Sequence, residues 1–312
     1  LTELFDGVFA LEWKPFLARN ARIHVNGKSA KSTLFSVSDC QSIVKKAIVE
    51  NLKAAYRTDT LPETGPEVIV EVGLLRDMAT LALDCCGAGL SRRGYRTYNV
   101  AAPLSETLGA AVVTLARYRA ELPLIDPMCG SGTMPIEAAM IAQNRAPGLG
   151  RAFAAEAWPF VEPSVWRLAR EEAHDSIRPV KLSILGSDAD PRCIELCKRH
   201  ARKAGVTVDW AVRPVETLAD ARTGGVLVCN PPYGERMLDR QEAERLYRRM
   251  RERFDLLNGW SVNIITAFQD FERVYGKRAV QRRKLSNGGM TCCLYRYAER
   301  TNECSGKEPQ KE

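Results

Sequence analysis

The tetrapeptide Asn230-Pro231-Pro232-Tyr233 brings together a polar amide, two rigid prolines and an aromatic ring directly after the apolar run Val226-Leu227-Val228-Cys229. Such a short apolar run, bounded by glycines and prolines, is typical of a parallel strand that is buried on both faces. The tetrapeptide then lies at the carboxyl end of the strand, where open α/β sheets bind their ligands. Because proline lacks an N–H donor, the Asn230 side chain and the Pro231 carbonyl remain as acceptors beside the ring. This combination suits a planar molecule with an exocyclic amine.

Taken alone, the same four residues also fit an ordinary turn after a strand. A second segment favours the ligand site. Residues 122–133 read Leu-Pro-Leu-Ile-Asp-Pro-Met-Cys-Gly-Ser-Gly-Thr and lead into a helical pattern from Met134 to Ala142. A strand, a glycine turn and a helix start form the first unit of a nucleotide-binding sheet. The segment lacks the Gly-Lys-Ser/Thr ending of a phosphate loop, which argues against an NTPase.

The next predicted strand, from Lys181 to Asp188, ends in an acidic residue and precedes a predicted helix from Arg192 to Lys203. A carboxylate at this position can accept hydrogen bonds from both hydroxyls of a ribose. Asp190 stands directly before Pro191, as expected for a helix N-cap followed by a first-turn proline. Asp188 is therefore the ligand candidate, and Asp190 has a structural role.

These three segments, in this order, resemble the class I S-adenosylmethionine-dependent methyltransferases that modify exocyclic or amide nitrogens. The continuation Gly234-Glu235-Arg236 is similar to the branch with an N-terminal THUMP domain, the bacterial guanine-N2 methyltransferases of 23S rRNA. Further stretches agree with this branch: Gly27 to Ser32, Asp39 to Ala47, Gly89 to Arg96 and Ala102 to Glu106. The resemblance runs from about residue 1 to 298. It implies an α/β fold, with a Rossmann-like class I methyltransferase sheet preceded by an α+β THUMP domain.

Length and resemblance together predict a THUMP-type RNA-binding domain at residues 1–100, a methyltransferase domain at residues 101–298 and a disordered polar tail at residues 299–312. The sequence begins at Leu1 without a methionine and in mid-pattern, so we expect the first subdomain of the THUMP half to be missing. The first half should contain a short strand at 23–25, a helix at 40–56 and strands at 67–75 and 78–85.

Basic side chains near glycines in the first half are the candidate RNA contacts. They are Lys28, Lys31, Lys45, Lys46, Arg92, Arg93 and Arg96. Clustered cations would suit the phosphates of a folded RNA helix or a 3′ end. The alternative is that they only keep the surface soluble, because the whole chain has a modest excess of 45 Lys and Arg over 38 Asp and Glu.

The resemblance also implies which residues contact the cofactor, S-adenosylmethionine: Asp126, Met128, Cys129, Gly130, Ser131, Gly132, Thr133, Asp188, Ala189 and Glu216. Pro214 occupies the position where the family has an aspartate, so we expect Glu216 to contact the adenine from a shifted position. Pro103 and Leu104 are expected at the methionine end of the cofactor, although packing alone would also explain them. The catalytic candidates are Asn230, Pro231, Pro232 and Tyr233.

Several other features limit the possibilities. Ten cysteines without a Cys-x-x-Cys pair and only three histidines argue against a zinc site, and cysteines inside apolar strands indicate a reduced, cytoplasmic protein. No signal peptide or long apolar run points to a membrane.

The mixed charges of the helix predicted at 241–257 favour a solvated face over an RNA stripe. The long insertion at 143–180 is more than a crossover needs, and its Trp158 and Trp166 favour core packing.

The sequence therefore predicts a cytoplasmic RNA methyltransferase that methylates guanine N2, most simply in rRNA, with no metal. Three alternatives remain open at this stage. The tetrapeptide also occurs in adenine-N6 methyltransferases of DNA and in glutamine methyltransferases of proteins. In the third alternative, the chain is an RNA-binding protein with a degenerate methyltransferase half.

Overall fold

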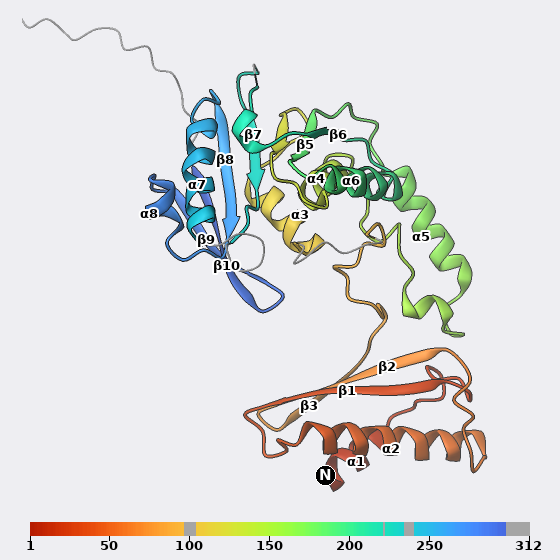
Figure 1. Cartoon of the computed structure of the whole chain (residues 1–312). Coiled ribbons are helices and arrows are strands. Elements are labelled where there is room, and N and C mark those ends of the chain that lie inside the picture. The colour runs from red at the N-terminus through yellow and green to blue at the C-terminus, as the bar shows by residue number, and fades with distance from the viewer. Residues whose placement is uncertain (97–103, 221, 234–239, 298–312) are drawn as a thin grey trace, which may run out of the picture. The chain divides into compact units, whose positions relative to one another are not determined.

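The computed structural model describes residues 1–96, 104–220, 222–233 and 240–297, which fall into two compact units (Figure 1). Unit 1 comprises Leu1–Leu90 and Arg151–Glu172, and unit 2 comprises Ser91–Gly150 and the chain from Ala173 onward. The chain thus passes from unit 1 to unit 2 after Leu90, returns to unit 1 for Arg151–Glu172 and then continues in unit 2. The predictions for Pro103, for 234–236 and for the 299–312 tail lie outside the described residues.

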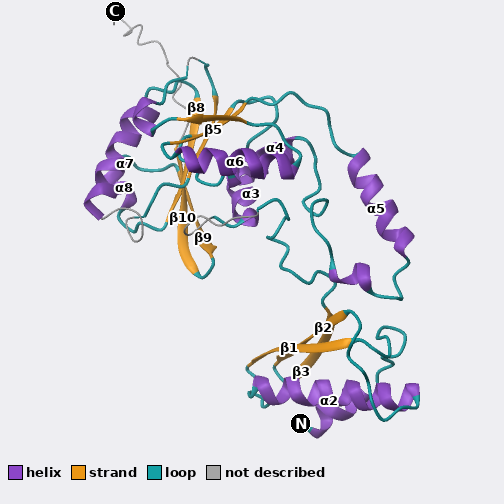
Figure 2. Ribbon diagram, turned by 45° about the vertical axis from the view of Figure 1, so that its right-hand side comes forward, coloured by secondary structure: helices purple, strands orange, loops and turns teal. Residues whose placement is uncertain are grey.

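Unit 1 is built on a three-stranded sheet, visible in Figure 2, with the order β1 (Arg22–Ala30), β2 (Glu67–Leu75), β3 (Met78–Leu83). β1 runs parallel to β2, and β3 is antiparallel to β2. Helix α2 (Val37–Tyr56) buries Val44, Ala47, Ile48 and Leu52 in one core with the alternating valines of β2, and α1 (Thr2–Phe9) joins the same core. The predicted elements are confirmed, but the helix begins three residues earlier, and the first strand is longer than predicted.

The middle of the insertion between the first and second strands of unit 2, Arg151–Glu172, belongs to unit 1. The insertion contains a 3-10 turn, η1 (Ala154–Ala157), and the helix α5 (Pro163–Asp175). Trp158 is only 3% exposed, and its indole N–H donates to the Glu67 carbonyl at 3.4 Å. The Arg151 guanidinium donates to the carbonyls of Cys86 and Gly89 at 2.9 and 2.8 Å. The insertion is therefore part of the first core, and the core position predicted for Trp158 is confirmed.

Unit 2 contains a seven-stranded sheet with the order β6-β5-β4-β7-β8-β10-β9. The strands are β4 (Leu124–Asp126), β5 (Ile184–Asp188), β6 (Asp209–Val212), β7 (Gly225–Cys229), β8 (Trp260–Thr266), β9 (Gln281–Asn287) and β10 (Met290–Tyr297). The first five strands of this order are parallel, and β10 is antiparallel to both β8 and β9. This is the predicted Rossmann-like α/β sheet, and the antiparallel pair β9 and β10 closes it as a hairpin.

Helices cover both faces of this sheet because its central strands are apolar on both faces. Leu124 pairs with Val226 and belongs to the core under α3 (Glu106–Leu115), α4 (Thr133–Ala142) and α6 (Pro191–Ala204). The next pair, Ile125 and Leu227, belongs to a second core under α7 (Arg240–Phe254) and α8 (Phe271–Tyr275). The carboxyl ends of β4, β5 and β7 are thereby held next to one another at one edge.

The strand β6 begins later than the apolar residues before it suggest. Val206 and Val208 would favour a strand start near residue 206, whereas β6 pairs with β5 only from Asp209, opposite Leu185. The chain first has to leave α6 through Gly205, which has a left-handed φ of 70°. The buried Val206 and Val208 belong to this connection, so their apolar character reflects core packing.

Candidate active site

The glycine segment 129–132 joins β4 to α4, and it lies directly after Pro127 and Met128, which line the pocket described below. Gly130 and Gly132 have left-handed φ angles of 54° and 83°, a conformation that favours glycine. A Cβ atom on Gly132 would also lie 2.8 Å from the Trp210 ring. Gly132 is the N-cap residue of α4, so the segment turns directly from the strand into the helix.

Two further contacts support this segment from α6. The Sγ atoms of Cys129 and Cys197 lie 3.8 Å apart, and both side chains are buried. His200 Nδ1 lies 3.0 Å from the Ser131 carbonyl. Burial lowers the pKa of His200, so the neutral ring donates its Nδ1 hydrogen to that carbonyl. The Cys129 and Ser131 side chains are therefore buried beneath the segment, and only its backbone is available to a ligand.

Asp126, the last residue of β4, carries a carboxylate that is 1% exposed. Its Oδ1 accepts from the Met128 backbone N–H at 3.2 Å, and its Oδ2 has no hydrogen-bond partner in the described part of the chain. Burial raises the pKa of Asp126 well above its ordinary value, and the negative charge of Asp188 raises it further. Such a carboxylate is stabilised by an incoming cation or donor.

Asp188, at the end of β5, is held in place by two loops. Its Oδ2 accepts from the Gly130 N–H at 3.0 Å, and its Oδ1 accepts from the Asp190 N–H at 2.9 Å. Each carboxylate oxygen keeps a further lone pair, so the group can still accept from two ligand hydroxyls. Asp190 caps α6 through the Arg192 N–H at 2.9 Å, which confirms its structural role.

A pocket of about 400 Å³ opens beside these strand ends, within the size range of small-molecule sites. It is lined by Pro127, Met128, Asp188, Ala189, Pro214, Val215, Glu216, Pro232, Glu242, Arg245, Leu246 and Arg249. The structure thus brings the predicted cofactor contacts Met128, Asp188, Ala189 and Glu216 to one cavity, together with Pro232 of the catalytic tetrapeptide.

The tetrapeptide follows β7 immediately and is held by two tyrosine hydroxyls. Tyr247 of α7 donates to the Pro232 carbonyl at 2.7 Å, and Tyr233 donates to Asn230 Oδ1 at 2.6 Å. Burial raises the pKa of Tyr233, so its hydroxyl keeps its proton and remains a donor. The Asn230 oxygen therefore has a fixed orientation and one remaining lone pair for a second donor. Pro231 is buried.

Helix α7 supplies a wall of the pocket that the sequence interpretation missed. Glu242, Arg245, Leu246 and Arg249 recur at intervals of three and four residues, so they share one face of the helix, and all four line the cavity. Arg249 forms an ion pair with Glu216 at 2.9 Å. Glu242, Arg245 and Arg249 are exposed, so the predicted solvated face is confirmed, and the same face borders the pocket. The three- and four-residue spacing of these side chains was the sequence signal that could have identified this shared face.

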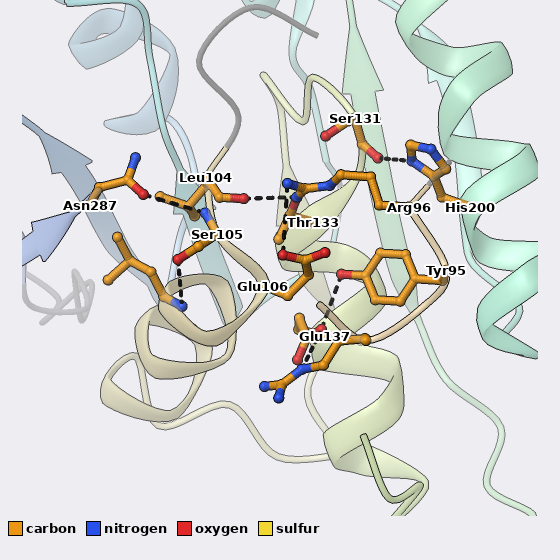
Figure 3. A network of polar contacts seen from close by, with 12 residues as sticks. Tyr95, Arg96, Leu104, Ser105, Glu106, Ser131, Thr133, Glu137, His200 and Asn287 are labelled. Carbon is orange, nitrogen blue, oxygen red and sulfur yellow. Dashed lines mark hydrogen bonds and ion pairs between the residues drawn. The ribbon is translucent and has the colours of Figure 1, made fainter. Parts of the chain in front are cut away.

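Arg93, a predicted RNA contact, belongs to a buried polar cluster with Glu137 of α4 and Tyr95; the latter two are labelled in Figure 3. Its side chain is 12% exposed and forms an ion pair with Glu137, at 3.6 Å between Nε and Oε1. Tyr95 Oη donates to the same Glu137 oxygen at 3.0 Å. Burial raises the pKa of Glu137, while the charge of Arg93 opposes that shift. This position does not suit phosphate binding, because the guanidinium is already engaged inside the unit.

Arg96 is the centre of the neighbouring cluster, also drawn in Figure 3, and its side chain is 11% exposed. One terminal nitrogen donates to the Leu104 carbonyl at 2.8 Å and to Thr133 Oγ1 at 2.6 Å, and the other lies 3.8 Å from Glu106. Arg96 thus joins the chain entering α3 to the start of α4. We therefore leave Arg93 and Arg96 out of the RNA contacts proposed below.

The remaining predicted RNA contacts lie on several elements. Lys28, Lys31, Lys46 and Arg92 are exposed, while the half-buried Lys45 forms an ion pair with Glu63 at 3.2 Å. Gly27 packs against α2, so the next residue of β1, Lys28, projects from the opposite face of the sheet. The structure therefore does not gather Lys28 with the lysines of α2 into one cluster.

In the described ranges, no group of three or more His, Cys, Asp or Glu side chains could hold a metal ion. Within the same residues, no helix is both long and apolar enough to cross a membrane.

Comparison with known proteins identifies both units. Residues 93–296 match the RMKL-like methyltransferase domain, and residues 1–84 match the THUMP domain. The Bacillus subtilis protein YpsC, which bears the name "Putative RNA methyltransferase", is 42% identical over 300 residues, covering 95% of this chain and 78% of YpsC.

Two solved structures are similar over nearly the whole chain. One, from Listeria monocytogenes, is described as a predicted N6-adenine-specific DNA methylase. It is 44% identical, with a TM-score of 0.89 over 96% of this chain and 79% of the Listeria chain. The other, SMU.472, was solved in complex with SAH. It is 39% identical, with a TM-score of 0.88 over 97% of this chain and 81% of its own. The chain therefore belongs to the RMKL-like methyltransferase family and carries a THUMP domain at its N-terminal end.

Proposed function

We propose that this methyltransferase transfers a methyl group from S-adenosylmethionine to the N2 amine of a guanine in RNA, most simply in 23S rRNA. The observation that carries the proposal is the common cavity of the tetrapeptide and the acidic strand ends: Pro232 lines the same pocket as Met128 and Asp188. In this proposal, the target amine and the cofactor would lie side by side at this edge of the sheet. The name of the relative YpsC and the THUMP domain support RNA as the substrate.

The residues at the strand ends fit S-adenosylmethionine. Asp188 offers free lone pairs on a fixed carboxylate for the ribose hydroxyls. The Oδ2 of Asp126 is buried and unpaired, and because its pKa is raised, a positive charge of the methionine end would stabilise its ionised form. The pocket also contains Val215 and Glu216, which would lie along the adenine. When bound, the cofactor supplies an electrophilic methyl group on a sulfonium.

The tetrapeptide would orient the target amine. Asn230 Oδ1 already accepts one hydrogen bond from Tyr233 and can accept a second from the amine. The Pro231 carbonyl offers another acceptor, and the Tyr233 ring a stacking surface for a base that has left its helix. Accepting from both N–H groups directs the nitrogen lone pair toward the methyl donor. A strong general base is not needed before attack, because the amine becomes acidic only once it is methylated.

A transfer assay with three substrate classes tests this proposal. The protein is incubated with isotopically labelled S-adenosylmethionine and, separately, with unmodified 23S rRNA, duplex DNA and a protein extract. We expect label in rRNA, recovered as N2-methylguanosine after digestion to nucleosides. Label in DNA or protein alone, with a protein that still binds the cofactor, would contradict it.

Adenine N6 in DNA is the second candidate, because the Listeria relative is described as a predicted N6-adenine-specific DNA methylase. The tetrapeptide chemistry does not separate the two, since both bases present an exocyclic amine to the same acceptors. The DNA arm of the assay, digested to nucleosides, decides between N6-methyladenine and no product.

A further inference from the structure

Phe35 is 83% exposed, the largest exposure among the exposed large hydrophobic side chains of the described residues. It lies in the loop between β1 and α2, next to the turn that joins β2 to β3, where Leu75 and Met78 are 57% and 70% exposed. Single exposed apolar residues are common, but an apolar group of this kind marks a contact surface when its backbone is fixed.

The backbone around Phe35 is fixed by its neighbours. Ser29 Oγ donates to the Leu34 carbonyl at 2.6 Å, and α2 begins two residues after Phe35, at Val37. Gly27 of β1 packs closely on the start of α2, because a Cβ atom there would lie 3.2 Å from Val37 and 3.0 Å from the Gln41 side chain. The ring of Phe35 is therefore displayed from a rigid loop.

The β2–β3 turn is joined to this loop by three hydrogen bonds. The Arg76 N–H donates to the Ala30 carbonyl at 3.3 Å, and the Asp77 N–H donates to Ser32 Oγ at 3.1 Å. The Thr33 N–H donates to Asp77 Oδ1 at 2.6 Å. The loop and the turn thus form one surface element.

The same element carries backbone strain at non-glycine residues. Lys31, Arg76 and Asp77 have left-handed φ angles of 50°, 51° and 61°. Glycine or asparagine would adopt this conformation at lower cost, and costly backbone conformations cluster at functional sites. At two of the three positions the strained residue is an exposed cation.

We propose that this element, made of Lys28, Lys31, Phe35, Arg76 and Met78, binds an unpaired nucleotide of the RNA substrate, with the base stacked on Phe35. The proposal rests on the proposed function and names where the THUMP unit holds single-stranded RNA. An exposed aromatic ring and exposed cations on one surface element suit single-stranded nucleic acid, because a base can stack on the ring while the phosphates meet the charges.

Charge favours RNA over an apolar protein segment as the occupant. Lys28, Lys31 and Arg76 are exposed, whereas the carboxylate of Asp77 accepts a hydrogen bond from the Thr33 N–H. Phosphates are complementary to these three cations. A protein ligand would bind through Phe35, Leu75 and Met78 without a strong dependence on salt, and the experiment below separates the two.

The test measures binding of the full chain to two fluorescent RNA hairpins of the same stem, one blunt and one with a single-stranded 3′ extension. Phe35→Ala should weaken binding of the extended hairpin about 5- to 150-fold, the usual range for one base–aromatic stack. Binding of the blunt hairpin should change little. Phe35→Trp should restore binding of the extended hairpin because it keeps an aromatic face.

Salt dependence identifies the role of each residue. Lys28→Ala and Arg76→Ala should each reduce the log-log salt slope by about 0.7, the value for one phosphate of a single strand, whereas Phe35→Ala should leave the slope unchanged. Leu256→Ala is the matched control, because this side chain is 66% exposed in unit 2. It should leave both affinities at the wild-type level.

Three results would overturn the inference: Phe35→Ala binding the extended hairpin as wild type does, an equal loss for both hairpins, or no recovery with Phe35→Trp. If the wild type methylates RNA in any of these cases, the proposed function stands and only this inference fails. A wild-type protein that neither binds nor methylates RNA removes both.

Discussion

Replacing Arg96 by alanine should destabilise unit 2 and should not act through RNA binding. The guanidinium is 11% exposed and holds the Leu104 carbonyl and Thr133 Oγ1 at 2.8 and 2.6 Å. Its other terminal nitrogen faces Glu106, a residue that is 6% exposed. Alanine would leave two acceptors and one buried carboxylate without their cation.

The size of this effect follows from those contacts. Removing one partner of a buried ion pair costs about 3–5 kcal/mol, because the other charge stays buried. Against a typical total of about 5–15 kcal/mol, this is a large share of the stability. Arg96→Lys keeps the charge but not the forked donor geometry, so we expect a loss of about 1–2 kcal/mol, equivalent to one or two hydrogen bonds. The exposed Arg119→Ala should stay within about 0.5 kcal/mol of the wild type.

Urea unfolding of the wild type and the three variants, followed by circular dichroism and tryptophan fluorescence, provides the measurement. The order of stability should be wild type and Arg119→Ala, then Arg96→Lys, then Arg96→Ala. An Arg96→Ala protein within about 1 kcal/mol of the wild type would refute the structural role, since a surface substitution has that size. If that variant instead lost RNA affinity and salt dependence, Arg96 would be a phosphate contact.

Three further substitutions address the pocket. Burial raises the pKa of Asp126, so the folded protein disfavours the ionised carboxylate. The resulting loss of stability is absent below the ordinary carboxyl pKa and develops as the pH rises through the raised pKa. Asp126→Asn should therefore raise the thermal midpoint at neutral pH but not at pH 4, while weakening cofactor binding; equal midpoints at neutral pH would argue against the penalty. Asp188→Ala should weaken S-adenosylmethionine binding by about 1–3 kcal/mol in calorimetry, as for a lost charged hydrogen bond; unchanged affinity would leave Asp188 only its contacts to Gly130 and Asp190. Asn230→Ala should reduce single-turnover methylation far more than cofactor affinity; a rate within a few-fold of the wild type would exclude amine positioning.

The sequence predicts the sheet well because buried parallel strands leave a clear pattern. β7 is a continuous apolar run between Gly224 and Asn230, and the side chain after it reaches the ligand edge whatever the rest of the fold does. The acidic ends of β4 and β5 follow from the same rule, and the structure brings Asp188 and Pro232 to one pocket.

Long-range partners could not be predicted in this way. Arg93 and Arg96 belong to a segment rich in cations and glycine, which resembles a surface, but their carboxylate partners Glu137 and Glu106 lie in two separate helices, α4 and α3. Local composition also does not show which core Trp158 joins, and the structure places it with unit 1. Both cases depend on tertiary packing, which no local pattern encodes.

The most direct test of the central claim is nucleoside mass spectrometry of 23S rRNA from cells that lack this protein, complemented with either the wild type or Asn230→Ala. If Asn230 orients a guanine amine, one N2-methylguanosine should be absent in the deletion strain, should return with the wild type and should stay absent with Asn230→Ala present at equal abundance. Return of the same modification with Asn230→Ala, or a change in N6-methyladenosine in place of N2-methylguanosine, would contradict it.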